Sequence, residues 1–290
     1  MNLEGRRESS NVEDRRGMSS GTKMGVGGIG GLIIAGIITL LMGGNLGDVL
    51  QQAGNMNLGE QVQTQGEQNF SAEEQELAKF ASVIEASTED VWTQIFRENN
   101  LGQYHPPTLV LYTGSTQTAC GQGSAAVGPF YCSGDQKLYL DLSFFSTMKK
   151  QLGADGDFAY AYVIAHEVGH HIEYLTGTLQ KAHQQMNRLG EADANKISVR
   201  LELLADFYAG VWAHYENKSF GSLDDSDLME AIKCAQVIGD DYLQKRAQGY
   251  AMPESFTHGT SEQRMKWFKL GFDTGDIRRG TTFQQSDATL

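Results

Sequence analysis

The distribution of apolar and polar positions divides the chain into four parts, residues 1–23, 24–43, 44–70 and 71–290. No charged residue occurs from Met24 to Gly47, and the run from Leu32 to Met42 is strongly apolar. Because about 20 consecutive apolar residues suffice to cross a bilayer, the second part is predicted to be a transmembrane anchor. The third part is rich in Gly, Gln and Asn, which is typical of a flexible linker.

Regular periodicity begins near Ser71. Ser71-Ala-Glu-Glu74 has the spacing of a helix-capping box, and periodic apolar residues continue to Phe96. Residues 108–113 and 137–142 are rich in β-branched, aromatic and leucine side chains and are predicted strands. From Phe144 the pattern is helical nearly to the end. Helices packed beside a small sheet predict an α+β domain.

Basic residues are unevenly placed around the apolar run. Residues 1–23 contain five Lys or Arg, whereas only Lys79 and Arg97 are basic between that run and residue 100. This bias predicts a cytoplasmic N-terminus, with the domain of residues 71–290 in the periplasm or outside the cell. A cleaved signal peptide is the alternative, although no A-x-A site follows the run. Gly27-x-x-x-Gly31 would let two anchor helices approach each other, so anchor self-association is a further hypothesis.

Composition narrows the classes of partner. The 290 residues carry a formal net charge of −13, so the chain lacks the excess of basic residues that binds nucleic acid. No nucleic-acid partner is therefore expected. Three cysteines are too few for a disulfide scaffold. In an oxidising compartment, Cys120 and Cys132 are expected to form a disulfide, while Cys234 stays a buried thiol. The alternative is that Cys120 and Cys132 bind a zinc ion together with His105.

The run from Phe158 to His171 contains an H-E-x-x-H motif. His166 and His170 lie just over one helical turn apart, so both project from one face and can share a tetrahedral zinc ion. Glu167 follows His166 and would lie beside the metal, where a carboxylate can accept a proton from water. The competing interpretation is an amphipathic helix whose histidines are hydrogen-bonded in the core.

A catalytic zinc ion needs a third protein ligand. Glu202 and Asp206 are also one turn apart, in a helical stretch that is otherwise apolar. Buried carboxylates are costly unless they are paired or bind metal. We therefore expect Glu202 to bind zinc and Asp206 to accept the N–H of a ligand imidazole, with the reverse assignment left open. His171 and His214 are weaker candidates, because His171 points about 100° away from the ligand face and His214 lies three turns beyond Glu202.

H-E-V-G-H-H followed by E-L-L-A-D is similar to the gluzincin pattern H-E-x-x-H…E-x-x-x-D. More closely, the chain resembles the bacterial family of predicted neutral zinc metallopeptidases, in its opening residues 5–17 and in five later segments. Those segments are residues 117–121, 128–132, 139–145, 161–171 and 255–264. The resemblance implies a zincin-like metallopeptidase domain, peptide-bond hydrolysis and Glu202 as the third zinc ligand.

Residues 257–264 resemble a further segment, the T-H-P-x-x-x-x-R of membrane-associated gluzincins, with Gly259 in place of the proline. His258 or Arg264 would then stabilise the oxyanion of a tetrahedral intermediate. The alternative is a helix N-terminus with a structural arginine.

The function expected from these residues is a membrane-anchored zinc endopeptidase that holds one Zn²⁺ and hydrolyses protein or peptide substrates, with Glu167 as the base. The substrate is expected to lie extended beside the strand Lys137–Leu142. Two alternatives stay open. One is a non-catalytic zinc protein of the membrane with a binding or chaperone-like role, and the other is a zinc hydrolase that acts on a non-peptide bond.

Overall fold

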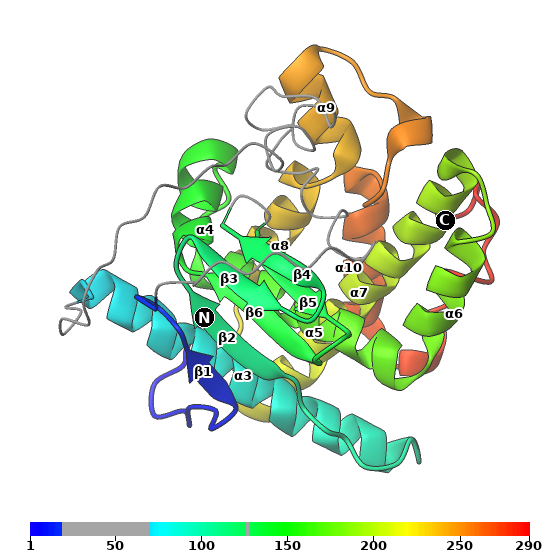
Figure 1. Ribbon diagram of the computed structural model, residues 1–290. Helices are drawn as coiled ribbons and strands as arrows, with labels where there is room; N and C mark the ends of the chain where they lie inside the picture. The colour runs from blue at the N-terminus through cyan, green and yellow to red at the C-terminus, as the bar shows by residue number, and fades with distance from the viewer. Residues whose placement is uncertain (19–69, 126–127) are drawn as a thin grey trace.

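The computed structural model describes residues 1–18, 70–125 and 128–290, and it shows a mixed fold that is mostly helical with a small sheet (Figure 1). The strands are β1 (Val12–Asp14), β2 (Thr108–Tyr112), β3 (Ser115–Thr118), β4 (Gly121–Ser124), β5 (Phe130–Cys132) and β6 (Lys137–Asp141). The helices are α3 (Ala72–Glu98), α4 (Ser143–Thr147), α5 (Asp157–Leu175), α6 (Thr178–Met186), α7 (Glu191–Phe220), α8 (Asp225–Val237), α9 (Asp240–Gln248) and α10 (Ser261–Thr274). A π-helical turn (Met148–Leu152) and two 3-10 turns (Pro253–Ser255 and Ile277–Arg279) connect them.

Most of the predicted elements are confirmed. The helix expected after Ser71 is α3, and the Ser71 side chain accepts the N–H of Glu74 at its start. The two predicted strands are β2 and β6. The hairpin β3–β4 and the strand β5 fall in the Gly-rich loop that carried no strand prediction.

The main sheet has the strand order β1-β2-β6-β5. β1, β2 and β6 are mutually parallel, and β5 runs antiparallel to β6. Side chains alternate between the two faces along each strand. One face contributes Leu109, Leu111, Leu138 and Leu140 to the core that it shares with the helices, and in Figure 1 the sheet lies in front of α3 and α5.

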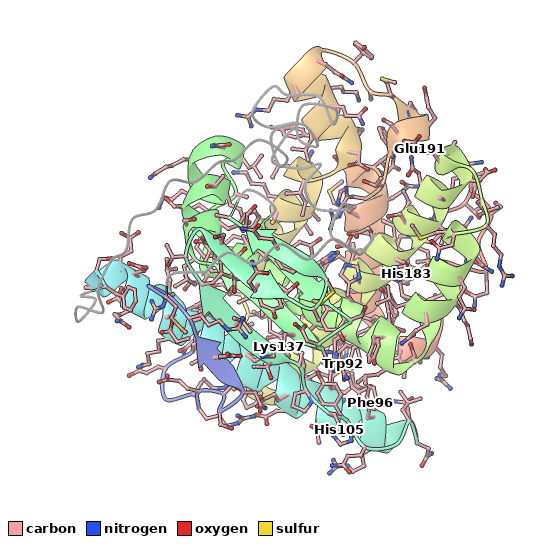
Figure 2. All side chains as sticks on the ribbon, viewed as in Figure 1. Trp92, Phe96, His105, Lys137, His183 and Glu191 are labelled. Atoms are coloured by element: carbon pink, nitrogen blue, oxygen red, sulfur yellow. A yellow bond between two sulfur atoms is a disulfide. The ribbon has the colours of Figure 1, made fainter. Side chains whose placement is uncertain are left out.

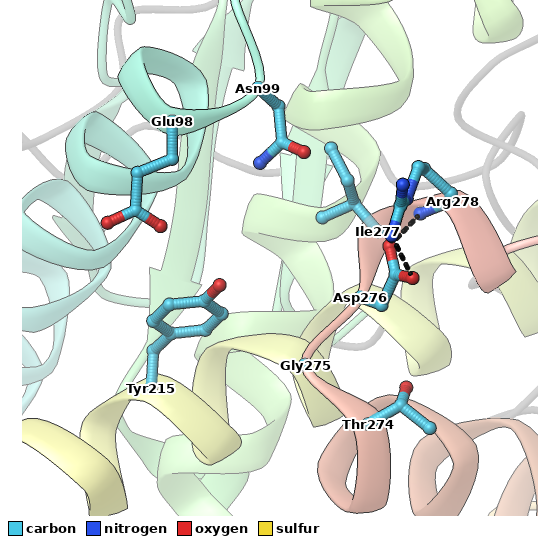
Figure 3. A pocket seen from close by; sticks show the side chains of 8 residues that line it. All are labelled: Glu98, Asn99, Tyr215, Thr274, Gly275, Asp276, Ile277 and Arg278. Carbon is cyan, nitrogen blue, oxygen red and sulfur yellow. Dashed lines mark hydrogen bonds and ion pairs between the residues drawn. The ribbon is translucent and has the colours of Figure 1, made fainter.

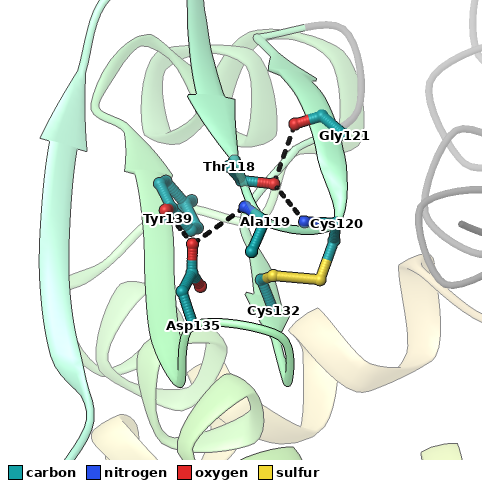
Figure 4. The surroundings of a disulfide bond; sticks show 7 residues. All are labelled: Thr118, Ala119, Cys120, Gly121, Cys132, Asp135 and Tyr139. Atoms are coloured by element: carbon teal, nitrogen blue, oxygen red, sulfur yellow. Dashed lines mark hydrogen bonds between the residues drawn. A yellow bond between two sulfur atoms is a disulfide. The ribbon is translucent and has the colours of Figure 1, made fainter. Parts of the chain in front are cut away.

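The other face of the sheet is covered by the β3–β4 hairpin. Phe130 and Tyr139 stack on this face with ring centroids 5.0 Å apart, and a Cβ at Gly123 of the hairpin would meet the Phe130 ring. The disulfide between Cys120 and Cys132 ties the turn of the hairpin to the end of β5 (Figure 4). The expected pairing is therefore present, and Cys234 is a buried free cysteine, as predicted.

The loop that follows α3 packs back onto that helix. The Phe96 and Tyr104 rings lie 5.1 Å apart, and Figure 2 shows His105 next to Phe96 at the lower edge of the molecule. This loop leads into β2 and brings the His105 carbonyl oxygen to α5, where it accepts a hydrogen bond from His171 (2.7 Å). Position 105 therefore takes part in the fold through its backbone.

Residues 1–18 are an integral part of this domain. β1 pairs with β2 in register Val12↔Leu109, and the Ser9 N–H donates to the carbonyl oxygen of Ser82 in α3 (3.0 Å). A strand cannot pair with a sheet across a bilayer, so this packing counts against the expected cytoplasmic location of residues 1–23, which stays a prediction. The predicted anchor, its self-association and the predicted linker up to residue 69 lie outside the described residues. Within the described ranges, no helix combines the length and the apolar character that a bilayer span requires.

Candidate metal centre

The H-E-x-x-H motif lies within α5, a helix of 19 residues whose central turns are buried. His166 and His170 project from one face, with ring centroids 4.9 Å apart. Glu202 approaches them from α7, with its carboxylate oxygens 3.2 Å from the Nε2 atom of His166 and 3.5 Å from that of His170. One ligand atom from each of the three residues lies within 4.8 Å of the other two. The three predicted ligands therefore converge on one point.

Gly169 allows the two helices to approach this closely. A Cβ at Gly169 would lie 2.8 Å from the carbonyl oxygen of Ala205 and 2.9 Å from its Cα atom, both in the backbone of α7. Gly169 lies between the two histidines in the sequence, and Ala205 lies between Glu202 and Asp206. The closest contact of the helices is therefore at the level of the site.

Each histidine is oriented by a carboxylate at its other nitrogen. Nδ1 of His166 is 2.8 Å from Asp206, and Nδ1 of His170 is 2.9 Å from Glu173. A carboxylate that accepts the Nδ1–H leaves Nε2 as the nitrogen that can bind metal. The position of Asp206 agrees with its predicted role. The role of Glu173 was not predicted. Its position three residues after His170 on the same helix could have indicated the contact, because residues three apart are neighbours on a helix surface.

The site concentrates negative charge in a buried setting. Burial opposes ionisation of Glu202, but the nearby histidines outweigh it and hold the pKa of that carboxyl well below its usual range. Burial likewise opposes protonation of His166, but Asp206 and Glu202 outweigh it and raise the pKa of His166. Carboxylates so placed attract a cation, and a metal ion takes the place of the proton on each imidazole. Two imidazole nitrogens with one carboxylate then form a donor set that zinc prefers.

Glu167 lies between the histidines and the edge of the sheet. The carboxyl group is buried, and the N–H of Tyr131 in β5 donates a hydrogen bond to it. Its other oxygen, Oε2, has no hydrogen-bond partner among the described residues. Burial raises the pKa of Glu167 above its ordinary value, against the opposing effect of His170. A partly unsatisfied carboxylate beside the ligand cluster has the placement that a general base requires.

His171 anchors β5 rather than binding metal. Its Nε2–H donates to the carbonyl oxygen of His105 (2.7 Å), so its Nδ1 is the acceptor of the Tyr131 hydroxyl (2.9 Å). Burial lowers the pKa of His171 to about 4, which agrees with a neutral ring. The second weak candidate, His214, donates to the carbonyl oxygen of Phe272 (2.7 Å). Both histidines therefore have roles in packing.

Arg264 pairs with Asp206, the carboxylate that contacts His166. Its Nε and Nη2 atoms lie 2.8 and 3.0 Å from the two oxygens of Asp206, which also accepts the Tyr162 hydroxyl. The guanidinium group is almost fully buried. It helps to hold the pKa of Asp206 at about 2, against the effect of burial. Residues 257–264 had two interpretations, an oxyanion-stabilising segment or a helix N-terminus with a structural arginine. The geometry of Arg264 agrees with the second, and Thr260 caps α10.

His258 is a different case. Its ring is buried, and Nδ1 lies 3.1 Å from Asp240 at the start of α9. Three backbone N–H groups, those of residues 257–259, also donate to Asp240 and fix the loop. Nε2 of His258 has no hydrogen-bond partner in the part of the chain that the structure describes. The ring interacts electrostatically with Glu202, so His258 belongs to the charged surroundings of the ligand cluster.

A cavity of about 320 Å³ lies elsewhere, among the C-terminal ends of α3, α7 and α10 (Figure 3). Its wall consists of Glu98, Asn99, Tyr215, Thr274, Gly275, Asp276, Ile277 and Arg278. None of the predicted site residues lines it, and its arginine is paired with Asp276 at 2.7 Å. The cavity is therefore separate from the metal centre.

An α+β domain with a buried two-histidine, one-glutamate site and an adjacent glutamate has the architecture of a zinc metallopeptidase. The chain belongs to the family described as "Putative neutral zinc metallopeptidase", whose model matches residues 1–283. It is 49% identical over 293 residues to YpfJ of Escherichia coli K12, an uncharacterized protein, covering 99% of this chain and all of that one. It is also 40% identical over 211 residues to the uncharacterized protein Rv2575 of Mycobacterium tuberculosis H37Rv, covering 69% of each chain. No solved structure matches the chain.

Proposed function

We propose that this protein is a zinc-dependent endopeptidase that hydrolyses peptide bonds in protein substrates. The observation that carries the proposal is the convergence of His166, His170 and Glu202 beside the buried carboxyl group of Glu167. Family membership supports a zinc peptidase, and the site adds the residues that would perform the reaction. The net charge of −13 argues against a nucleic-acid substrate.

The residues present fit a catalytic zinc ion. His166, His170 and Glu202 would hold it, and such three-ligand sites leave a fourth position for water or substrate. Zinc bound there supplies a Lewis acid that makes water a nucleophile near neutral pH. A structural zinc site uses four protein ligands and needs no base, so the three-residue cluster with Glu167 favours catalysis.

The chain's own residues provide the proton transfers. Glu167 takes a proton from the attacking water and returns it to the leaving amine, and its free oxygen Oε2 provides the acceptor. The free Nε2 of His258, oriented through Asp240, donates a hydrogen bond to the oxygen of the scissile carbonyl as negative charge develops on it. Arg264 acts only through Asp206, by keeping that carboxylate ionised.

The strand that binds substrate must have a free edge. β6 (Lys137–Asp141), beside which the substrate was expected, is flanked by β2 and β5, so its backbone groups are already paired. The expected position is therefore wrong. β5 pairs with β6 alone among the described strands, and the Tyr131 N–H on its outer edge points to Glu167. We place the extended substrate along β5, where added strands gain backbone hydrogen bonds.

The test uses the full-length chain with casein as a denatured substrate. We expect one zinc ion per chain, and cleavage that stops with a chelator and returns with added zinc. Glu167→Gln should retain zinc but lose about 10²- to 10⁴-fold in turnover, whereas the exposed control Glu191→Gln should behave like the unmodified protein. Turnover retained by Glu167→Gln would refute the assigned base. Stoichiometric zinc without cleavage of any denatured protein would favour the non-catalytic alternative.

A further inference from the structure

The arginines that precede the apolar run form ion pairs with carboxylates of the catalytic domain. Arg6 lies 2.6 Å from Glu216 at the end of α7, and that carboxylate is fully buried and also accepts the Ser87 hydroxyl. Arg7 pairs with Glu89 of α3 at 2.8 Å. A buried carboxylate such as Glu216 becomes costly when its partner is removed. These arginines are therefore needed by the fold.

The remaining two arginines of this segment also lie in the sheet region. Arg15 donates to both oxygens of Glu13, and one of them also accepts a hydrogen bond from the ammonium group of Lys137 in β6 (2.7 Å). Arg16 is buried, pairs with Asp14 and donates to a backbone carbonyl oxygen of α3. The charge bias that predicted a cytoplasmic N-terminus thus has a second explanation in the folded domain.

The described residues on either side of the segment 19–69 lie close together. The guanidinium group of Arg16 lies 4.2 Å from the centroid of the Phe70 ring. Residue 16 precedes the segment 19–69, and residue 70 follows it. Both ends of this segment therefore meet at the N-terminal end of α3, next to the edge strand β1.

From these contacts we infer that the N-terminal segment and the catalytic domain lie in the same compartment, outside the cytoplasm. The pairing of β1 with β2 requires a shared compartment. The disulfide between Cys120 and Cys132 indicates that this compartment is oxidising.

Thiol labelling tests the inference in the full-length protein. Cys120 and Cys132 are bonded and Cys234 is buried, so an added cysteine is the accessible thiol. Glu8→Cys reports on the N-terminal segment, and Gln184→Cys on α6 is the matched control, because both positions are exposed. In spheroplasts treated with a membrane-impermeant maleimide, we expect both variants to be labelled as fully as after lysis, while a cytoplasmic thiol protein stays unlabelled.

Two outcomes would overturn the inference. Labelling of Glu8→Cys only after lysis, with Gln184→Cys labelled in intact spheroplasts, would separate the N-terminus from the domain. Labelling of both variants only after lysis would place them together in the cytoplasm. Neither result depends on zinc or on turnover, so failure here is distinguishable from failure of the proposed peptidase activity.

A second measurement tests the packing itself. Arg6→Met should lower the melting temperature of the purified full-length protein by about 5 °C or more, because it leaves Glu216 without its cation. Arg188→Met, at an exposed position after α6, is the control and should shift it by less than about 1 °C. Equal shifts in the two variants would show that the N-terminal segment does not dock on α7.

Discussion

Substitution of Gly169 by alanine tests whether close helix packing sets the geometry of the metal centre. The added Cβ would lie 2.8 Å from the carbonyl oxygen of Ala205, whereas ordinary contact begins at 3.4 Å. Because the opposing atoms belong to the backbone of α7, they cannot rotate away. The helices must therefore separate by about half an ångström at the level of Glu202. Metal sites tolerate only about 0.2 Å in their ligand distances.

Two effects on stability oppose each other in this variant. Overpacking costs about 1–3 kcal/mol, while alanine is favoured over glycine in a helix by about 1 kcal/mol. The net loss of unfolding free energy is thus small, about 0–2 kcal/mol. Zinc affinity should nevertheless fall by about 10-fold or more, because one ligand is displaced from the other two.

The assay is competition for zinc with a fluorescent chelator, together with thermal unfolding of the metal-free protein. Gly190→Ala is the matched control, because no atom lies within 4 Å of the added Cβ and its φ of −72° suits any residue. Equal zinc affinity in Gly169→Ala and Gly190→Ala would refute the argument that this contact positions Glu202.

The remaining predictions concern the ligands, their carboxylate partners and the disulfide. Glu202→Gln should lower zinc affinity far more than Asp206→Asn, for which we expect a loss of about 10- to 100-fold; the opposite order would exchange their roles. Glu173→Gln should lower zinc affinity within the same range of about 10- to 100-fold, and an unchanged affinity would restrict Glu173 to packing. Replacing Cys120 and Cys132 by alanine should lower the unfolding free energy by about 3 kcal/mol, and an unchanged denaturant midpoint would contradict this.

The three candidate ligands could be predicted because their spacing follows directly from helix geometry. Residues four apart share a face, so the sequence alone placed His166 beside His170 and Glu202 beside Asp206. The sequence did not show how α5 and α7 pack together. Their close approach depends on Gly169, and the need for a glycine there is seen only when α7 is placed against it. Asp240 was missed for a similar reason, since it reaches His258 from a different helix.

The strand along which we place the substrate was harder to predict than the metal ligands. β5 has only three residues and follows a Gly-rich loop, so it shows too little alternation to be recognised. Its position depends on long-range contacts, namely the disulfide of Cys132 and the bond from the Tyr131 hydroxyl to His171. β6 had the stronger strand pattern because it is buried on both sides, and for that reason it has no free edge.

The N-terminal arginines show why a charge pattern can support two incompatible conclusions. A cluster of basic residues before an apolar run is expected when the cluster stays in the cytoplasm. The same residues are also expected when a folded domain contains buried carboxylates that require partners. Only contacts distinguish these cases, and the contacts of Arg6 with Glu216 and of Arg16 with Asp14 belong to the second.

The metal centre requires α5, α7 and α10 together, because each helix supplies a group that the others need. Gly210 and Gly271 allow α7 and α10 to touch backbone to backbone, which brings the buried guanidinium group of Arg264 onto Asp206. That cation keeps Asp206 ionised, and an ionised Asp206 keeps the Nδ1–H of His166 directed away from the ligand position. Loss of the contact between α7 and α10 would therefore change the orientation of the His166 ring, although the H-E-x-x-H motif itself is unchanged. The effect would pass through the hydrogen bonds from Arg264 to Asp206 and from His166 to Asp206.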